Sequence, residues 1–319
     1  MTAHNSFQTL ACPQCGAGLP SAADNVICQY CGTRLIRTPA GPAGAAETLA
    51  QGMRFSPHIC MDVGGTGLEA FRVLIPSGWQ VNGGVVWLPD NPSMPATLGY
   101  QIYNPAGAEA LEVFPTLPFY WFNDPLSLMA LPMGSRYFGC EVHPPLPVIQ
   151  AMKQITLPRF RNIAGLIIAK EELVPDLPRQ VAGNATAQTG YNPQMEGGHL
   201  RIQYPSRLRL AFEEDLIGVV AVTRAGIPSM FGYTEIISWQ LNYQMGFRAS
   251  FGQLDQLADL FRTIITSFQL NPRWYATIVQ MGQYMTQNQI QRIHDIGQMS
   301  RSFSQTANQI GDAQVQGYY

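Results

Sequence analysis

Six cysteines are the residues of this 319-residue chain whose types and spacing most directly indicate chemistry. Four of them form two pairs, in which two residues separate the thiols and a glycine follows the second: Cys12, Cys15, Cys28 and Cys31. This spacing lets a tight turn direct both thiolates of a pair at one ion, and two pairs complete the four-sulfur tetrahedron of structural zinc. The sequence therefore predicts one structural Zn2+ per chain, held by these four cysteines.

The segment around these cysteines, about residues 8–37, resembles a zinc-ribbon domain. A segment of this length buries too little apolar surface to fold alone, so we expect the metal to supply its folding free energy. The alternative is two disulfides, which the paired spacing and the absence of a secretory signal disfavour. Zinc ribbons often contact nucleic acid, but the basic residues here are only Arg34 and Arg37, against Asp24. A protein-docking unit or a spacer is the role we expect.

The two remaining cysteines each have a histidine close in sequence. Cys60 lies two residues after His58, and Cys140 lies three residues before His143. The four side chains could form a second metal site, or Cys140 and His143 could act as nucleophile and base. Isolated cysteines are usually small buried apolar residues, which is the interpretation we favour. Cys140 and His143 remain the alternative, enzymatic hypothesis.

A glycine-rich segment at residues 62–67, with the sequence DVGGTG, resembles the first phosphate loop of the actin and sugar-kinase superfamily. In that role backbone N–H groups would approach a phosphate and Asp62 would face the metal. The superfamily also needs a second phosphate loop and an adenosine site, and the sequence contains neither. We favour a hairpin turn that joins 58–63 to 68–75, in which glycine supplies positive φ.

Two acidic clusters are candidates for acid–base chemistry, Glu171–Glu172 and Glu213–Glu214–Asp215. At the ends of predicted strands, such clusters are more often solvated turns, and we favour that interpretation. His199 and His294 have no partner that sequence reasoning identifies. Since no complete catalytic set emerges, we expect a protein that is not an enzyme.

These residues must be positioned by a chain of several parts. Residues 38–50 read TPAGPAGAAETLA, so we expect a flexible linker over 38–54 and a domain boundary there. Residues 55–271 are rich in aromatic and β-branched residues interrupted by Pro and Gly. Their pattern predicts strands at 68–75, 84–88, 97–103, 109–114, 165–173, 199–204, 208–213, 216–224 and 234–249.

Two helices accompany the strands. One is predicted near 146–156, and a clearer one at 253–268, where six apolar residues fall on one face. The order is a strand meander, an irregular middle at 115–175, further antiparallel strands and a closing helix. This order indicates an α+β domain, with an antiparallel sheet covered by helices.

The two ends of this domain carry motifs. The opening FRVLIPSGW at 71–79 and the closing RASFGQLDQLADLFRTIITSFQL at 248–270 resemble a PsbP-like domain, which starts with a strand running into P-x-G-W and ends with a helix finishing in S-F. The residues that carry the resemblance are Pro76, Gly78, Trp79, Ser267 and Phe268. That family is mostly non-enzymatic and binds other proteins, so the resemblance implies a protein-binding role.

The last segment, 272–319, has a different composition. Residues 273–312 contain eight glutamines, no proline and five charges: Arg273, Arg292, Asp295, Arg301 and Asp312. Apolar residues recur at intervals of mostly three and four: Ile278, Met281, Met285, Ile290, Ile293, Ile296, Met299, Phe303, Ala307 and Ile310. The pattern predicts a long amphipathic helix. It either packs along its own domain or forms an oligomerisation interface, and we favour the interface.

Charged residues make up only 13% of the chain, about half of the ~25% that is usual, and the net charge is −2. A surface this poor in charge is weakly protected against self-association, so we expect a homo-oligomer formed through the C-terminal helix, or a covering partner protein. The acidic balance disfavours nucleic-acid binding. A nucleic-acid-associated zinc-ribbon protein is therefore the alternative and not the favoured hypothesis.

No apolar run approaches the ~18–20 residues of a membrane-spanning helix, and no secretory signal is recognisable. The expected location is therefore the cytoplasm. Taken together, the residues predict a non-enzymatic assembly or adaptor protein with a structural zinc ribbon.

Overall fold

The computed structural model describes residues 53–182, 193–205, 211–229, 232–289 and 291, together with the backbone of short strands before residue 37. The chain divides into two compact units, Met1–Arg54 and Phe55–Tyr319. In the first unit two antiparallel pairs are described, β1 (Leu10–Ala11) with β2 (Gly18–Leu19) and β3 (Asn25–Ile27) with β4 (Arg34–Ile36). The predicted zinc ligands Cys12, Cys15, Cys28 and Cys31 lie outside the described residues.

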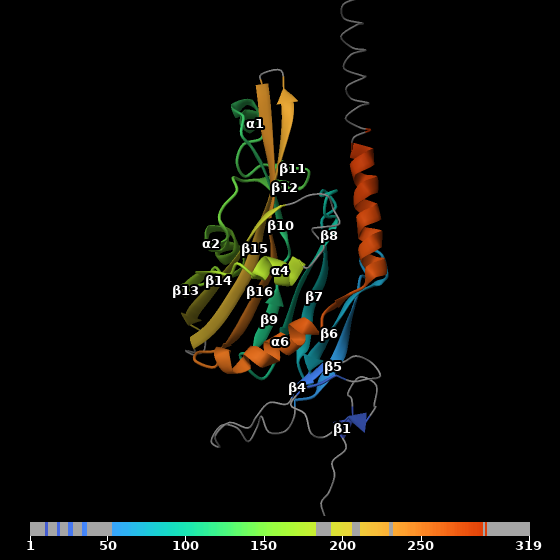
Figure 1. Ribbon diagram of the computed structural model, residues 1–319, viewed down its shortest axis with the longest axis vertical. Helices are drawn as coiled ribbons and strands as arrows, with labels where there is room; N and C mark the ends of the chain where they lie inside the picture. The colour runs from blue at the N-terminus through green and yellow to red at the C-terminus, as the bar shows by residue number, and fades with distance from the viewer. Residues whose placement is uncertain are drawn as a thin grey trace, which may run out of the picture. The chain divides into compact units, whose positions relative to one another are not determined.

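The second unit is built on a mostly antiparallel sheet that curls into half a barrel (Figure 1). Ten strands form it within the described residues: β7 (Gln80–Trp87), β8 (Ala96–Tyr103), β9 (Ala110–Val113), β10 (Leu117–Phe122), β11 (Arg136–Tyr137), β12 (Cys140–Val142), β13 (Ile167–Leu173), β14 (Gln194–Pro205), β15 (Ala211–Ser229) and β16 (Gly232–Ser250). One arm runs in the order β11-β12-β10-β16-β15-β14-β13, and β9-β8-β7 forms a second arm from β16. The long β16 therefore connects the two arms.

Two strands share one edge of β16. Its residues 236–241 pair with β10, and its residues 245–248 pair with β9. Near this change of partner, the register with β15 shifts and Tyr243 adopts a left-handed φ of 50°. A bulge of this kind bends a strand and redirects its side chains. The two arms consequently border two different cores.

The first core lies under a continuous helical segment on one face of β14, β15 and β16. The segment consists of α2 (Val148–Ala151), the π-helical η1 (Met152–Thr156) and α3 (Leu157–Phe160). Its side chains meet those of the sheet around Met152, Leu200 and Trp239, which are almost fully buried. Trp239 also stacks on Phe119 at 4.2 Å between ring centroids, which joins β16 to β10.

The second core lies between the other arm and a small sheet. In the described part of the chain that sheet has three strands, β5 (Phe55–Met61), β6 (Glu69–Pro76) and β17 (Gln269–Leu270). It is closed by η2 (Leu254–Leu257) and α6 (Ala258–Thr266). Phe71, Ile102 and Ile264 form its centre, each fully buried. Two further short helices, α1 (Pro125–Ala130) and α4 (Leu177–Ala182), belong neither to the helical segment that covers the first core nor to the helices that close the second.

The mixed α+β class, the strands β6, β8 and β9 and the closing helix agree with the predictions from sequence. Two predictions are wrong. The strands expected at 208–213 and 216–224 are not separate, because β15 runs from Ala211 to Ser229 without a break. The middle, 115–175, is not irregular: it holds β10, α1, β11, β12, the helical segment and most of β13.

Residues 272–289 are helical, so the first half of the predicted C-terminal helix is present. Trp274 and Ile278 are buried in the second core, and a Cβ on Gly282 would lie 2.6 Å from the carbonyl oxygen of Pro92. This half packs along its own domain, while Met281 is 38% exposed. Within the described residues, no helix has the length and apolar character needed to cross a membrane.

Candidate functional site

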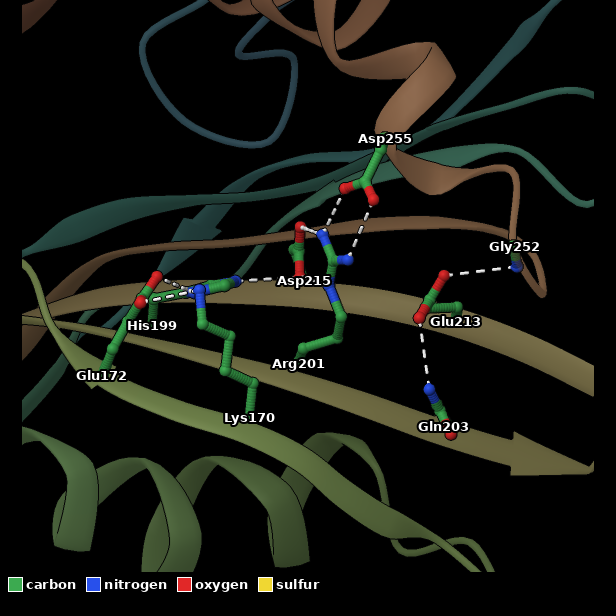
Figure 2. A network of polar contacts seen from close by, with 9 residues as sticks. All are labelled: Lys170, Glu172, His199, Arg201, Gln203, Glu213, Asp215, Gly252 and Asp255. Atoms are coloured by element: carbon green, nitrogen blue, oxygen red, sulfur yellow. Dashed lines mark hydrogen bonds and ion pairs between the residues drawn. The ribbon is translucent and has the colours of Figure 1, made fainter.

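Six charged side chains of alternating sign form a row, five of them on the face of β13, β14 and β15 opposite the helical segment and the sixth on η2 (Figure 2). In order they are Lys170, Glu172, His199, Asp215, Arg201 and Asp255, and we name this row the charge ladder. The register explains it, because Glu172 lies opposite His199 and Arg201 lies opposite Asp215. Directly opposite residues of antiparallel strands point to the same face.

His199 is the centre of the charge ladder. Its Nδ1 lies 2.8 Å from Glu172 Oε1, and its Nε2 lies 2.8 Å from Asp215 Oδ1. Arg201 donates to both oxygens of Asp215 at 2.7 and 2.8 Å, and its Nη2 lies 2.7 Å from Asp255 Oδ1. Every member of the charge ladder thus has a partner of opposite sign.

The electrostatics of His199 follow from its two carboxylate neighbours. Both ring nitrogens must donate, so the imidazole is protonated in this arrangement. Burial lowers the pKa of His199, but Asp215 and Glu172 together raise it above the usual 6.5. Burial alone would raise the pKa of Asp215, but its contacts with Arg201 and His199 lower this pKa to about 2. A protonated histidine with both nitrogens engaged is neither a general base nor a metal ligand.

These contacts correct the interpretation of the acidic clusters as solvated turns at strand ends. The clusters lie within β13 and β15, and Glu171 forms an ion pair of 2.7 Å with Lys153. His199, which sequence reasoning left without a partner, has two. One signal could have found the arrangement: Arg201 and Asp215 are equally distant from residue 208, as expected for opposite charges facing each other across a hairpin.

A second ion pair lies on the other face of β15, inside the molecule. Arg161, at the end of α3, donates to both carboxylate oxygens of Glu214 at 2.8 and 2.6 Å and to Glu112 at 2.6 Å. The side chains of Arg161 and Glu214 are 9% and 0% exposed. Tyr204 also donates its hydroxyl to Glu214 at 2.8 Å. This pair fixes the helical segment to β15 and β9, and both carboxylate oxygens of Glu214 accept hydrogen bonds.

Asp62, the candidate phosphate-loop residue, lies in a hairpin turn between β5 and β6, as we favoured. It is 2% exposed. Its carboxylate accepts hydrogen bonds from Trp87 Nε1 at 2.9 Å, from Trp274 Nε1 at 3.0 Å, and from the backbone N–H and hydroxyl of Thr66 at 3.0 and 2.9 Å. The turn therefore binds two indole groups from distant parts of the chain.

The glycines of this turn have a structural reason. The indole of Trp87 lies so close to Gly65 that a Cβ there would overlap its ring. Gly67 has a φ of 70°, which closes the turn. Burial raises the pKa of Asp62, but the hydrogen bonds together hold it below its usual value. The carboxylate is thus ionised and held by neutral donors, an arrangement that joins the turn, β7 and the C-terminal helix.

The second candidate metal or nucleophile site does not come together. Among the described residues, no group of three His, Cys, Asp or Glu side chains could hold a metal ion. Cys140 is buried, and burial, partly offset by Asn91, raises its pKa to about 11, so it is a protonated thiol at neutral pH. His143 faces the carbonyl oxygen of Pro144 through Nδ1 at 2.8 Å. Burial also raises the pKa of the Cys60 thiol.

A hollow of about 560 Å3 lies between the helical segment and β13. Its lining includes Ile149, Leu173 and the ion pair of Lys153 with Glu171. β13 carries Lys170 and a bulge after Ile168, and both features protect a sheet edge from the addition of another strand. The charged groups that line this hollow are engaged within the chain: Lys153 with Glu171, and Glu196 with the backbone N–H of Val148.

The C-terminal helix presents large apolar side chains to solvent. Tyr275, Val279 and Tyr284 are 55%, 41% and 67% exposed, and Tyr243 on β16 is 38% exposed. Burial raises the pKa of Tyr243, and the Tyr275 phenol adds to the shift. We name Tyr243, Tyr275 and Val279 the tyrosine flank. In residues 272–291 the sequence contains one charge, Arg273.

No family model and no curated protein matches this chain. Among solved structures, it is similar to LpqN, a protein involved in cell envelope biogenesis of Mycobacterium tuberculosis, with 12% identity, a TM-score of 0.27 and coverage of 69% of this chain and 92% of that chain. It is also similar to PsbP (CyanoP) from Synechocystis sp. PCC 6803, with 12% identity, a TM-score of 0.25 and coverage of 73% and 98%. Both are similarities of fold alone.

Proposed function

We propose that this protein is a non-enzymatic assembly protein that self-associates through its C-terminal helix. One observation carries the proposal: the helix buries Trp274 and Ile278 against its own domain and still exposes Tyr275, Val279 and Tyr284. A surface helix normally turns charged or polar residues to solvent. Here the exposed side combines apolar residues with a near absence of charge, which favours a second helix as its cover.

The described polar clusters support a non-enzymatic role. The charge ladder, the Arg161–Glu214 pair and the Asp62 turn each satisfy their charged groups with partners inside the chain. Catalytic acids and bases need a group left available to a substrate. These clusters instead stabilise the sheet and fix the helices that cover it, which is the property expected of a rigid platform.

The remaining residues of the chain extend the proposed interface. The sequence beyond residue 291 continues with Ile293, Ile296, Met299 and Phe303 at helical spacing and with few charges. Glutamines in the same segment can hydrogen-bond across helices without the desolvation cost of a buried ion. The cytoplasm is the compartment in which we expect the assembly to form.

The mass of the full-length protein in solution tests the proposal. We expect an oligomer at micromolar concentration by native mass spectrometry and light scattering. Ile293→Asp should dissociate it by placing a charge in the interface, while the far-ultraviolet circular dichroism of the main domain is unchanged. Gln287→Asp, an exposed position, is the matched control and should leave the mass unaltered. A wild-type monomer at that concentration would contradict the proposed function.

The zinc ribbon is part of the same proposal, as a structural or docking unit. Zn2+ bound by Cys12, Cys15, Cys28 and Cys31 would stabilise residues 8–37 without an open coordination position. Metal analysis of the purified protein should give about one zinc per chain. Cys28→Ser should release it and leave the thermal unfolding of the main domain unchanged. Less than about half an equivalent of zinc in the wild type, or oxidised thiols, would refute this assignment.

A further inference from the structure

The small sheet has one strand edge that no other described strand pairs with. Its order is β17-β6-β5, so β5 pairs with β6 on one side only. Charged side chains, bulges and prolines usually protect such an edge from the addition of another strand. β13 has Lys170 and a bulge, whereas the sequence of β5, FSPHICM, contains no acidic residue, lysine or arginine. The bulge in the pairing of β5 lies on β6, where Ala70 is the extra residue, so β5 itself is regular.

The hydrogen bonds on the far side of β6 show which of its backbone groups face β5. The N–H of Asn271 donates to the carbonyl oxygen of Ala70 at 2.9 Å, and the N–H of Leu74 donates to the Ser267 hydroxyl at 2.9 Å. Successive residues of a strand direct their N–H and C=O groups to opposite edges. The residues of β6 that bond β5 are therefore Phe71, Val73 and Ile75.

The register then identifies the free backbone groups of β5. Phe71, Val73 and Ile75 are in register with Cys60, His58 and Ser56, whose N–H and C=O groups are thus engaged. Beyond them, the N–H of Asp62 donates to the carbonyl oxygen of Leu68 at 2.8 Å, which also belongs to the inner side. The residues whose backbone groups point outward are Phe55, Pro57, Ile59 and Met61, and we name these groups the β5 edge.

Apolar side chains accompany the β5 edge. Ile59 is 49% exposed, Met61 is 46% exposed, and Pro57 is exposed as well. Cys60, between them, is 8% exposed and points inward, since a Cβ on Gly84 would lie 2.8 Å from its Sγ. Free backbone groups and exposed apolar side chains therefore coincide at Ile59 and Met61. A second extended strand is the partner that satisfies both.

Pro57 determines how such a strand can pair. It has no N–H, and its ring occupies the place of the donor, so a ladder across it is interrupted. Two copies of β5 avoid this when they pair antiparallel about a two-fold axis at Cys60. Ile59 of one copy then lies opposite Met61 of the other, and each such pair exchanges two hydrogen bonds. Pro57 lies beyond the ladder, and a shift of the register by two residues would place it against Met61 or leave Ile59 unpaired.

We propose that β5 is a second self-association site, at which the β5 edge of another copy pairs antiparallel across a two-fold axis at Cys60. The pairing joins the small sheets of two copies into one and covers Ile59 and Met61 of both. A second copy fits because it supplies matching donors and acceptors, places apolar side chains opposite apolar ones and buries no charge. The site goes beyond the proposed function, since it uses no residue of the C-terminal helix.

The contact is small, so we expect it to be weak by itself. Contacts that bury less than about 1,200 Å2 in total are typical of transient association. A dissociation constant of about 0.1–1 mM is the expected range. At micromolar concentration the C-terminal helix would therefore dominate assembly. The full-length Ile293→Asp variant, in which the helix contact is disrupted, isolates the contact at β5.

Sedimentation of this variant tests the proposal. It should be a monomer at about 5 μM and partly a dimer at about 500 μM. Addition of Ile59→Lys should raise the dissociation constant at least about tenfold, because it places a charge opposite Met61 of the second copy. Gln269→Lys makes a charge change at an exposed position of β17, the other edge strand of the same sheet, and should leave the dissociation constant unaltered.

Hydrogen exchange locates the contact. The amides of residues 55–61 should exchange more slowly at about 500 μM than at about 5 μM, whereas β6 should not change. A variant that stays monomeric, an Ile59→Lys variant that dimerises equally well, or a dimer with unchanged exchange at 55–61 would overturn the inference. Slow exchange there at both concentrations would indicate that the chain covers its own edge, and would overturn it too. A wild-type monomer at micromolar concentration would refute only the proposed function.

Discussion

Two of the buried carboxylates of the domain, those of Glu214 and Asp62, are stabilised in different ways. Glu214 is fully buried against Arg161, which donates to both of its oxygens. Asp62 is 2% exposed, and the groups that donate hydrogen bonds to its carboxylate are neutral: two indoles, one hydroxyl and one backbone N–H. The first joins a helical segment to a sheet, and the second joins a turn, a strand and the C-terminal helix.

The difference predicts how each region loses stability when one of its residues is replaced. A buried ion pair is stable as a unit, but loss of one member leaves the other charge unpaired in a medium that solvates it poorly. A carboxylate held by neutral donors leaves behind only unpaired N–H and O–H groups when it is removed, which costs less for each group. The region around Glu214 should therefore depend on a matched pair, and the region around Asp62 on a single residue.

Removal of the Glu214 carboxylate should have the largest effect. Glu214→Leu leaves Arg161 buried with only Glu112, so we expect a loss of about 3–5 kcal/mol in the free energy of unfolding. Urea denaturation measures it. The paired variant Arg161→Met/Glu214→Leu should recover most of the loss, because both charges of the buried pair are removed and Glu112, whose side chain is 24% exposed, is partly solvated. A double variant as unstable as Glu214→Leu would show that the loss of stability does not come from an unpaired buried charge.

Removal of the Asp62 carboxylate should cost less and have no such rescue. Asp62→Ala leaves the indole N–H groups of Trp87 and Trp274 without an acceptor, and we expect a loss of about 1–3 kcal/mol. Hydrogen exchange should become faster in residues 274–289, because the helix loses its polar attachment. Unchanged exchange in that segment would show that Trp274 is held by packing alone.

The pH dependence sharpens the comparison on the acid side. The folded-state pKa of Asp62 lies below its usual value, so its contribution to stability is present above about pH 4 and is lost as the pH falls through the folded pKa. Thermal unfolding from pH 5 to pH 2 should show a steep decrease for the wild type. Asp62→Asn should flatten the decrease, although Asp215, with a pKa of about 2, contributes in the same range.

The charge ladder should show the smallest effect and the opposite sign. The pKa of His199 is raised in the folded state, so its contribution is present below about pH 6.5 and is lost as the pH rises through the folded pKa. His199→Gln should cost about 0.5–1 kcal/mol at pH 6, since Glu172 is partly exposed. The difference from the wild type should vanish at alkaline pH. A constant difference would assign the effect to packing rather than charge.

The parts of the fold that sequence could predict are those with a strong local period. The alternation in residues 234–249 and the apolar face of 253–268 were sufficient to predict β16 and the closing helix. The acidic run at 213–215 concealed the continuity of β15, because it resembles a solvated turn. The sequence pattern cannot show that Glu214 faces Arg161 on one side of the strand and that Asp215 faces His199 on the other. The long middle was missed because β11 and β12 are only two and three residues long.

The candidate sites depended on contacts between residues far apart in sequence. Asp62 and Trp274 are separated by 212 positions, and Arg161 and Glu214 by 53. A single sequence contains no information that pairs such residues. The glycines at 64, 65 and 67 were a correct signal of special backbone conformation, but the partner that Gly65 makes room for is an indole rather than a phosphate.

The hydrogen bonds that Asp62 accepts from two indoles make tryptophan fluorescence a reporter of this region. Trp87 and Trp274 donate their N–H groups to one ionised carboxylate, and Trp274 is the tryptophan of the C-terminal helix. The excited state of indole is more polar than its ground state, so a fixed negative charge at Nε1 shifts its emission. Any event that moves this helix, including assembly, temperature or binding of another protein, should be visible in the intrinsic fluorescence of the unlabelled chain.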